Sequence, residues 1–117
     1  MRWQKIELKG DMESLKRWGA GCTVSKDKQQ ILIFGGRTSQ DLNSLIRIDL
    51  KKQSIESVGI SNSPMGRRRP SVHCCHENCL FMFGGYASEG FKNDFYYLKL
   101  SQREKERKTP KAPSSKL

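Results

Sequence analysis

The chain has 117 residues, a net charge of +10, 35% hydrophobic residues and 29% charged residues. This length favours a single small domain, and no segment contains the roughly 20 apolar residues of a membrane-spanning helix. The N-terminus also lacks the apolar core of a secretory signal peptide. We therefore expect a cytoplasmic or nuclear protein, in which the four cysteines are thiols rather than disulfides.

The predicted elements are all strands, because residues 1–100 show short apolar runs between turn-forming residues and no sustained helical period. The segment 101–117 holds six Lys or Arg against two acids, with one leucine and no aromatic residue. Such a composition predicts a disordered basic tail. The sequence thus predicts one domain over 1–100 and a tail over 101–117. The expected strands are 3–8, 19–24, 30–34, 44–49, 54–58, 71–76, 79–83 and 94–99.

These strands form a repeat of about 50 residues. The segment ILIFGGR at 31–37 returns 49 residues later as LFMFGGY at 80–86, and NSLIRIDL at 43–50 returns at an offset of 50 as NDFYYLKL. An offset of 52 aligns the 3–8 segment with 55–60, and Cys22 with Cys74. A four-stranded antiparallel unit repeating at this interval is typical of a β-propeller blade.

The repeat resembles the kelch repeat, in which an Arg opens the first strand, two glycines end the second and aromatic residues occupy the later strands. The resemblance implies an all-β fold of antiparallel four-stranded propeller blades of kelch type. It implies one complete blade plus a split second blade, whose fourth strand is the 3–8 segment. The chain departs from the family pattern at Ile55, where a Trp is usual. The matching residues are Trp3, Arg17, Gly35, Gly36, Arg69, Gly84 and Gly85.

The number of repeats leaves two interpretations open. Propellers close with about four to eight blades, whereas this chain supplies two. Either several copies assemble into a ring, or the chain is a fragment of a longer kelch protein. In both cases apolar surface would stay uncovered in the isolated chain, so we expect self-association or a need for missing blades. The strand faces concerned lie around Val24, Ile33, Phe34, Phe81 and Phe83.

A cluster of zinc-ligand residue types occurs in HCCHENC at 73–79. Strand alternation sends His73 and Cys75 to one face, and Cys74 and His76 to the other, while Cys79 joins from the next strand. Neither face offers four ligands, so we expect no metal there. The alignment of Cys74 with Cys22 favours small apolar core residues at both positions.

Enzyme motifs are not found in the sequence. It contains no Cys-x-x-Cys, no phosphate-binding loop and no spacing that supports a Ser-His-Asp set. We therefore expect a protein that is not an enzyme and that needs no cofactor.

Basic residues suggest where a partner binds. In GRRRP at 66–70, Arg69 matches the structural Arg17 of the repeat, which leaves Arg67 and Arg68 as additional charges in the loop between blades. In kelch propellers that loop lies on the usual partner-binding face. The residues after the two glycine pairs, Arg37 and Tyr86, resemble positions from which kelch domains contact peptides. Since Arg can bind carboxylates and Tyr gives a large contact area, we expect a protein partner, and an acidic partner is one possibility. The alternative is that Arg37 and Tyr86 only cap the ends of their strands.

Three functions stay open at this point. The first is a protein-interaction module, such as an adaptor or scaffold, that binds through loops on one face. The second is an oligomerising propeller that binds carbohydrate or nucleic acid. Nucleic acid is disfavoured because a broad basic stripe with exposed aromatics is needed, and Trp18 beside Arg17 is the one such pairing in the sequence. The third is a truncated fragment without independent activity.

Overall fold

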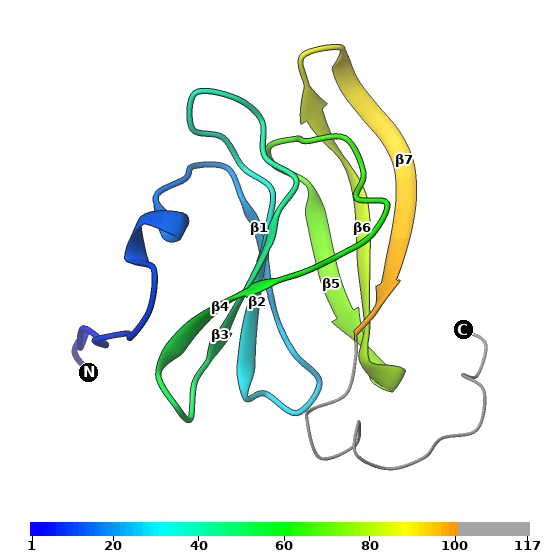
Figure 1. Ribbon diagram of the computed structural model, residues 1–117. Helices are drawn as coiled ribbons and strands as arrows, with labels where there is room; N and C mark the ends of the chain where they lie inside the picture. The colour runs from blue at the N-terminus through cyan, green and yellow to red at the C-terminus, as the bar shows by residue number, and fades with distance from the viewer. Residues whose placement is uncertain (101–117) are drawn as a thin grey trace.

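Seven strands build two antiparallel sheets in the computed structural model, which describes residues 1–100 (Figure 1). The predicted tail lies outside the described residues. The strands are β1 (Gly21–Val24), β2 (Gln30–Phe34), β3 (Leu45–Asp49) and β4 (Ser54–Val58) in the first sheet, and β5 (Ser71–Cys75), β6 (Cys79–Ala87) and β7 (Gly90–Lys99) in the second. Each sheet keeps its strands in sequence order. The predicted all-β fold of antiparallel sheets is therefore confirmed.

Two short 3-10 helices, η1 (Met12–Leu15) and η2 (His76–Asn78), complete the described elements. The carboxylate of Asp11 accepts a hydrogen bond from the backbone N–H of Glu13 at 3.1 Å, which caps η1. Helix η1 lies in a segment that the sequence predicted as a loop. Among residues 1–100, no helix has the length and apolar character that crossing a membrane requires.

The strand register shows how the two sheets correspond. Phe34 of β2 lies opposite Gly21 of β1, and Phe83 of β6 lies opposite Ser71 of β5. The first strands of the two repeats are therefore related by an offset of 50 rather than 52. This register places Cys22 at the position of Val72 rather than that of Cys74.

The expectation that Cys22 is a core residue is consequently wrong. Cys22 is exposed, whereas Cys74 packs against the buried cluster between the sheets. Successive side chains of a strand point to opposite faces, so an alignment error of two residues preserves the face but moves a residue along the strand. Cys22 is exposed because it lies on the face of the first sheet that points away from the second sheet.

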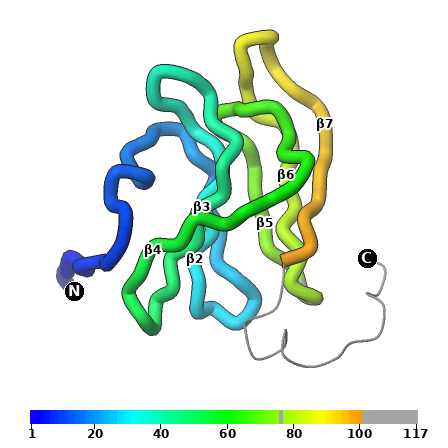
Figure 2. Tube along the Cα trace, in the orientation of Figure 1, coloured from blue at the N-terminus to red at the C-terminus, as the bar shows by residue number. Residues whose placement is uncertain are grey.

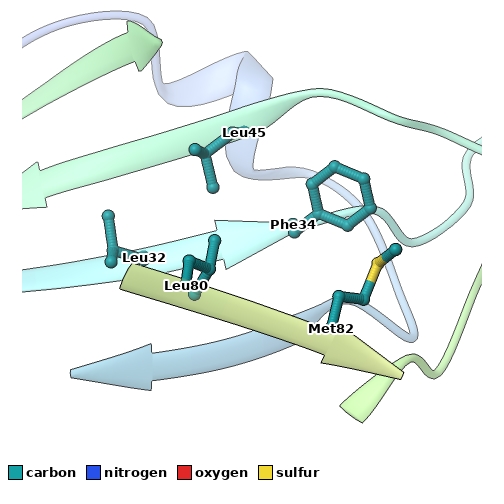
Figure 3. Packing of buried hydrophobic residues seen from close by; sticks show 5 residues of the cluster. All are labelled: Leu32, Phe34, Leu45, Leu80 and Met82. Carbon is teal, nitrogen blue, oxygen red and sulfur yellow. The ribbon is translucent and has the colours of Figure 1, made fainter. Parts of the chain in front are cut away.

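A shared core holds the two sheets together. Leu32, Phe34 and Leu45 of the first sheet point toward Leu80 and Met82 of the second (Figure 3), and none of these side chains is more than 6% exposed. Burying a side chain of this size stabilises a fold by roughly 1.5–3 kcal/mol. The expectation that Phe34 would stay uncovered is therefore wrong, because the second sheet covers it.

The two glycine pairs occupy equivalent places, as the repeat predicted. The φ angles are +76° and +95° at Gly35 and Gly36, and +69° and +106° at Gly84 and Gly85. A Cβ atom at Gly35 would stand 2.7 Å from the carbonyl oxygen of Arg67. The glycines thus adopt a conformation that other residues avoid, and at Gly35 they also admit a close backbone approach.

Strand β6 continues past its glycine pair, whereas β2 ends before it. A register shift between Phe83 and Gly85 marks a bulge, after which β6 and β7 form a hairpin that closes at the pair of Ala87 and Gly90. The sequence predicted that the second strand of this repeat ends at residue 83 and that the third begins at residue 94. The hairpin beyond the bulge is longer than predicted.

The N-terminal segment corrects another prediction. Residues 3–8 form no strand, and the Trp3 side chain is fully exposed. The chain reaches a sheet at Lys9, whose N–H donates to the Gln53 carbonyl and whose carbonyl accepts from the Ile55 N–H, both at 2.8 Å. Lys9 therefore lies beside β4. The predicted split blade would instead place the 3–8 segment beside β7, which lies on the other side of the molecule (Figure 2).

The face of the second sheet that points away from the core is aromatic. The ring of Phe81 lies 5.7 Å from that of Phe95 and 6.2 Å from that of Tyr97, and the rings of Phe83 and Phe95 are 6.3 Å apart. Phe83, Phe95 and Tyr97 are all more than half exposed. This row agrees with the expectation of uncovered apolar surface around Phe81 and Phe83.

Candidate functional site

The ends of β2 and β6 place Arg37 and Tyr86 beside residues of the preceding loops. Arg37 and Trp18 exchange two backbone hydrogen bonds of 2.8 and 3.2 Å. Arg68 and Tyr86 exchange two of 2.9 Å. The two pairs are repeat equivalents, because Trp18 and Arg68 are 50 residues apart and Arg37 and Tyr86 are 49 apart.

Arg68 lies at the centre of a group of side chains drawn from both repeats. Its guanidinium carbon is 4.6 Å from the ring centroid of Tyr86 and 5.7 Å from that of Trp18. One oxygen of Asp41 accepts hydrogen bonds from Arg68 Nη1 at 2.7 Å and from Arg37 Nη1 at 3.0 Å. We refer to Trp18, Arg37, Asp41, Arg68 and Tyr86 as the Arg68 cluster.

The Arg68 cluster is positively charged and partly exposed to solvent. Its two guanidinium groups and one carboxylate carry a net charge of +1. The Arg37 side chain is 33% exposed, whereas those of Arg68 and Asp41 are 18% and 10% exposed. Trp18 is half exposed, and the guanidinium of Arg69 lies 6.0 Å from the centroid of its ring. A cation held between aromatic rings is favourable by roughly 0.5–2 kcal/mol.

An exposed ring extends this surface. Phe91, the second residue of β7, packs edge-on against Tyr86 with ring centroids 5.1 Å apart, and it is 90% exposed. Sequence reasoning named Arg37, Arg68 and Tyr86 but missed Asp41 and Phe91. Asp41 follows Arg37 by four residues, but that spacing brings side chains together on helices, so it gave no signal for an ion pair in this loop.

Arg67 is placed differently from the prediction. Its side chain is fully buried and donates to both carboxylate oxygens of Asp94, at 2.5 and 3.1 Å, and to the carbonyl of Gly84 at 3.1 Å. The hydrogen bonds from Arg67 lower the pKa of the Asp94 carboxyl group below its ordinary value. With no exposed surface, Arg67 has no means to contact a partner, and the partner-binding role predicted for it is corrected here.

The structural arginine of the second repeat is Arg67, not Arg69. Arg17 Nη1 donates to the carbonyl of Gly35 at 2.9 Å, as Arg67 Nη1 does to that of Gly84. Arg69 instead is exposed and has a φ of +57°. Because three arginines are consecutive, a sequence alignment can match any of them with Arg17. The hydrogen bond to the carbonyl of the first glycine in each pair identifies Arg67, at an offset of 50.

The Cys/His segment of the second repeat is divided between the two faces of its sheet. Cys74 lies opposite Leu80 on the core side, and His73 lies opposite Phe81 on the other side. Within residues 1–100, no three His, Cys, Asp or Glu side chains are arranged to hold a metal ion. Burial is the main cause that raises the pKa of the Cys74 thiol, which keeps it protonated and weakly nucleophilic.

Comparisons with known proteins agree with this architecture. The family model of the KLHDC2/KLHL20/DRC7 Kelch-repeats domain matches residues 1–116. The chain is 27% identical over 106 residues to Adagio-like protein 1 of Oryza sativa subsp. japonica, and 25% identical over 105 residues to Adagio protein 3 of Arabidopsis thaliana. These matches cover 87% and 86% of the chain but 16% of each relative. With two sheets related by a 50-residue repeat and paired glycines in both, the chain belongs to the Kelch-repeat family.

Proposed function

We propose that the chain is a protein-interaction module that binds an acidic segment of a partner through the Arg68 cluster. Kelch-repeat domains are generally protein-interaction modules. The observation that carries the proposal is the pair of arginines, Arg37 and Arg68, that share one carboxylate oxygen beside exposed aromatic rings. A carboxylate from a partner would find positive charge and apolar surface at the same place.

Arg37 is the residue that we propose to contact the partner's carboxylate. A guanidinium has five N–H donors, and Arg37 uses one to Asp41 and one to the carbonyl of Ser39, at 3.0 and 3.3 Å. Its remaining donors and its partial exposure support a charge-assisted bond to a carboxylate. Arg68 is held more firmly, so we propose that it adds positive charge and orients Asp41 and the rings.

Trp18, Tyr86 and Phe91 would supply the apolar part of the contact. Large rings bury much surface at low entropic cost, and they are enriched among the residues that dominate binding energy. The net charge of residues 1–100 is +6, because 16 of the 22 basic residues and 10 of the 12 acidic residues lie there. That charge favours the approach of acidic partners. Assembled copies or additional blades would enlarge the same face.

Single-stranded nucleic acid is the second candidate ligand. The guanidinium of Arg68 lies near the rings of both Tyr86 and Trp18, and that of Arg69 lies near the ring of Trp18. Interleaved basic and aromatic side chains of this kind stack bases and contact phosphates. The same surface could therefore bind an oligonucleotide, and an experiment that compares both ligands separates the two functions.

The test measures binding of a labelled peptide rich in Glu and Phe, and of a labelled oligonucleotide, by fluorescence anisotropy. We expect Arg37→Ala to weaken peptide binding at least about tenfold, which corresponds to ~1.4 kcal/mol. Lys51→Ala, which removes an exposed positive charge in the turn after β3, is the matched control and should change little. Equal losses in both variants would contradict the proposal, and tighter binding of the oligonucleotide would favour the second candidate.

The biological setting of this function is also a proposal. We propose an adaptor or scaffold role without catalytic activity, in the cytoplasm or the nucleus. All four cysteines are free, which supports a reducing compartment. Since the chain spans 16% of its relatives' length, we expect binding in the assembled form, where neighbouring blades complete the surface.

A further inference from the structure

Four exposed lysines lie in two turns of the first sheet. Lys26 and Lys28 belong to the turn between β1 and β2, and Lys51 and Lys52 belong to the turn between β3 and β4. Because the strands alternate in direction, both turns lie at one end of the sheet, and the β2–β3 connection lies at the other end (Figure 1). The fold thus gathers lysines that are distant in the sequence.

Backbone hydrogen bonds hold these turns together. The Leu50 N–H donates to the Gln29 carbonyl at 2.9 Å, which joins the two turns. Lys9, which is also exposed, donates its N–H to the Gln53 carbonyl at 2.8 Å and so lies beside the second turn. We refer to the five lysines at this end, Lys9, Lys26, Lys28, Lys51 and Lys52, as the lysine surface.

The carboxylates of the same region are bonded to the turns. Asp27 Oδ1 accepts hydrogen bonds from the Ser25 hydroxyl at 2.6 Å and from the Gln29 N–H at 2.9 Å. Asp49 is 3% exposed, and its Oδ1 accepts from the Lys52 N–H at 3.0 Å. Within residues 1–100, no side chain of the lysine surface forms an ion pair with a carboxylate. Five lysines and two carboxylates leave a net charge of +3.

The chain continues from this end into further basic sequence. The Leu100 N–H donates to the Asn78 carbonyl at 3.0 Å, so β7 ends beside η2, which is the turn of the second sheet equivalent to the β1–β2 turn. The residues that follow Leu100 carry six Lys or Arg and two acids. Positive charge of both origins favours the approach of a polyanion to this end.

We propose that the lysine surface binds the phosphate backbone of duplex nucleic acid, independently of base sequence. A DNA duplex carries one negative charge per roughly 1.7 Å of its axis, and Lys binds phosphate as a point charge that needs no single geometry. Arg37 and Asp41 of the Arg68 cluster lie in the β2–β3 connection, at the other end of the sheet. A protein partner and a duplex would therefore bind without competing.

The residues of the two turns favour a duplex over other polyanions. Residues 25–29 and 50–53 contain no aromatic side chain, whereas the bases of a single strand stack on aromatic rings. The large apolar side chain among them, Leu50, is 37% exposed. Stable binding to a bilayer requires buried apolar groups in addition to basic charge. The rows of phosphates on a duplex require neither.

The first experiment measures binding of the full chain to a labelled duplex of about 20 base pairs by fluorescence anisotropy, at several salt concentrations. We expect Lys51→Ala/Lys52→Ala to weaken binding at least about tenfold at low salt, and to reduce the slope of log affinity against log salt by about 2. Lys26→Ala, in the other turn, should reduce the slope by about 1.

The matched control is Lys16→Ala/Lys92→Ala, which removes the same charge from two lysines that pair with glutamates outside the two turns. It should change duplex binding by less than about threefold. Equal losses in the two double variants would overturn the proposal, because binding would then follow net charge alone. Unchanged binding in both would also overturn it, since the contact would then lie on another part of the chain.

The second experiment compares ligands. The duplex should bind more tightly than either of its separate strands, and more tightly than vesicles that contain phosphatidylserine; the reverse order in either comparison would overturn the proposal. Lys51→Ala/Lys52→Ala should bind the peptide rich in Glu and Phe as the unmodified chain does. Loss of duplex binding with peptide binding retained would thus separate the lysine surface from the Arg68 cluster.

Discussion

The two sheets have the same internal geometry but different surroundings. Both have the same hairpin register, both carry a glycine pair with positive φ, and both place an arginine on the carbonyl of the first glycine. The first sheet has four strands and covers its aromatic residue, Phe34, with its neighbour. The second has three described strands, and the equivalent residue, Phe83, is 51% exposed. Equivalent residues therefore differ in burial because, among residues 1–100, only the first sheet has a neighbour on that side.

The equivalent arginines show a second difference. Arg17 donates to the carbonyls of Ser14 and Gly35, both neutral acceptors. Arg67 donates to the Gly84 carbonyl and also forms a bidentate ion pair with Asp94. A buried charge requires such a partner, whereas a partly exposed one can be hydrated. The arginine of the second repeat is thus stabilised by an ion pair, whereas the equivalent arginine of the first repeat is not.

The largest difference should appear when the equivalent phenylalanines are truncated. Phe34→Ala should lower the free energy of unfolding by about 3–5 kcal/mol, because it leaves a cavity in the shared core. Phe83→Ala should lower it by less than about 1 kcal/mol, because its ring is already half exposed. Urea titration followed by circular dichroism measures both values. Similar losses in the two variants would show that the aromatic face of the second sheet is covered in solution.

The ion pair provides the next comparison. Asp94→Ala leaves the Arg67 guanidinium buried without its carboxylate, and we expect a loss of about 3 kcal/mol, the lower end for a broken buried pair because Asp94 is 29% exposed. Its repeat equivalent Ser44 carries no such pair, so Ser44→Ala should stay within about 0.5 kcal/mol. The same urea titration measures both changes. A loss under about 1 kcal/mol for Asp94→Ala would show that water replaces the carboxylate.

The first glycine of each pair should respond unequally to alanine. At Gly35 the added Cβ would lie 2.7 Å from a backbone oxygen of Arg67, which cannot move aside easily, whereas at Gly84 the nearest atom is 3.2 Å away. Both positions have positive φ, which costs roughly 1–2 kcal/mol for an L-residue. We therefore expect about 2 kcal/mol or more for Gly35→Ala and about 1 kcal/mol for Gly84→Ala, measured as shifts in urea midpoint. The reverse order would contradict the close approach.

The smallest effect concerns pH. The pKa of Asp94 lies below its ordinary value of 3.8 in the folded chain, chiefly through its hydrogen bonds with Arg67. A carboxyl with a lowered folded pKa contributes stability above its unfolded pKa and loses it as the pH falls through the folded value. Asp94→Asn should therefore lose less stability than the unmodified chain as the pH falls below about 3.8. Unfolding followed by circular dichroism at pH 2–5 tests this, with Arg17→Ala as a control whose profile should match that of the unmodified chain.

The sequence predicted the strands well where apolar residues alternate between turns. The bounds of β2 and β4 agree with the prediction, and those of β1, β3 and β5 differ by one or two residues at an end. Strands β6 and β7 extend further than predicted, since the bulge at Gly85 continues the ladder across residues that usually end a strand. The helix η1 was missed because four residues are too few for a helical period.

The candidate site was only partly predictable, because it depends on an exact register. The run of three arginines made Arg69 the apparent partner of Arg17, and hydrogen bonds to a glycine carbonyl, which no sequence pattern reveals, identify Arg67 instead. The same error placed Arg67 on the surface. The structure brings Arg37, Arg68 and Tyr86 together, and their role in binding stays a prediction. Asp41, which joins the two arginines, was not named.

The segment that joins the two sheets has a consequence for cooperativity. It crosses from β4 to β5 (Figure 2), and on its way the Arg67 carbonyl accepts from the Gly36 N–H at 2.8 Å while the Arg67 N–H donates to the Leu42 carbonyl at 3.0 Å. Opening the second repeat would thus remove backbone partners from the first. Units coupled through such an interface unfold together when the coupling exceeds the stability of each alone. We therefore expect the connecting segment to couple the unfolding of the two repeats, through backbone hydrogen bonds that do not depend on the identity of its side chains.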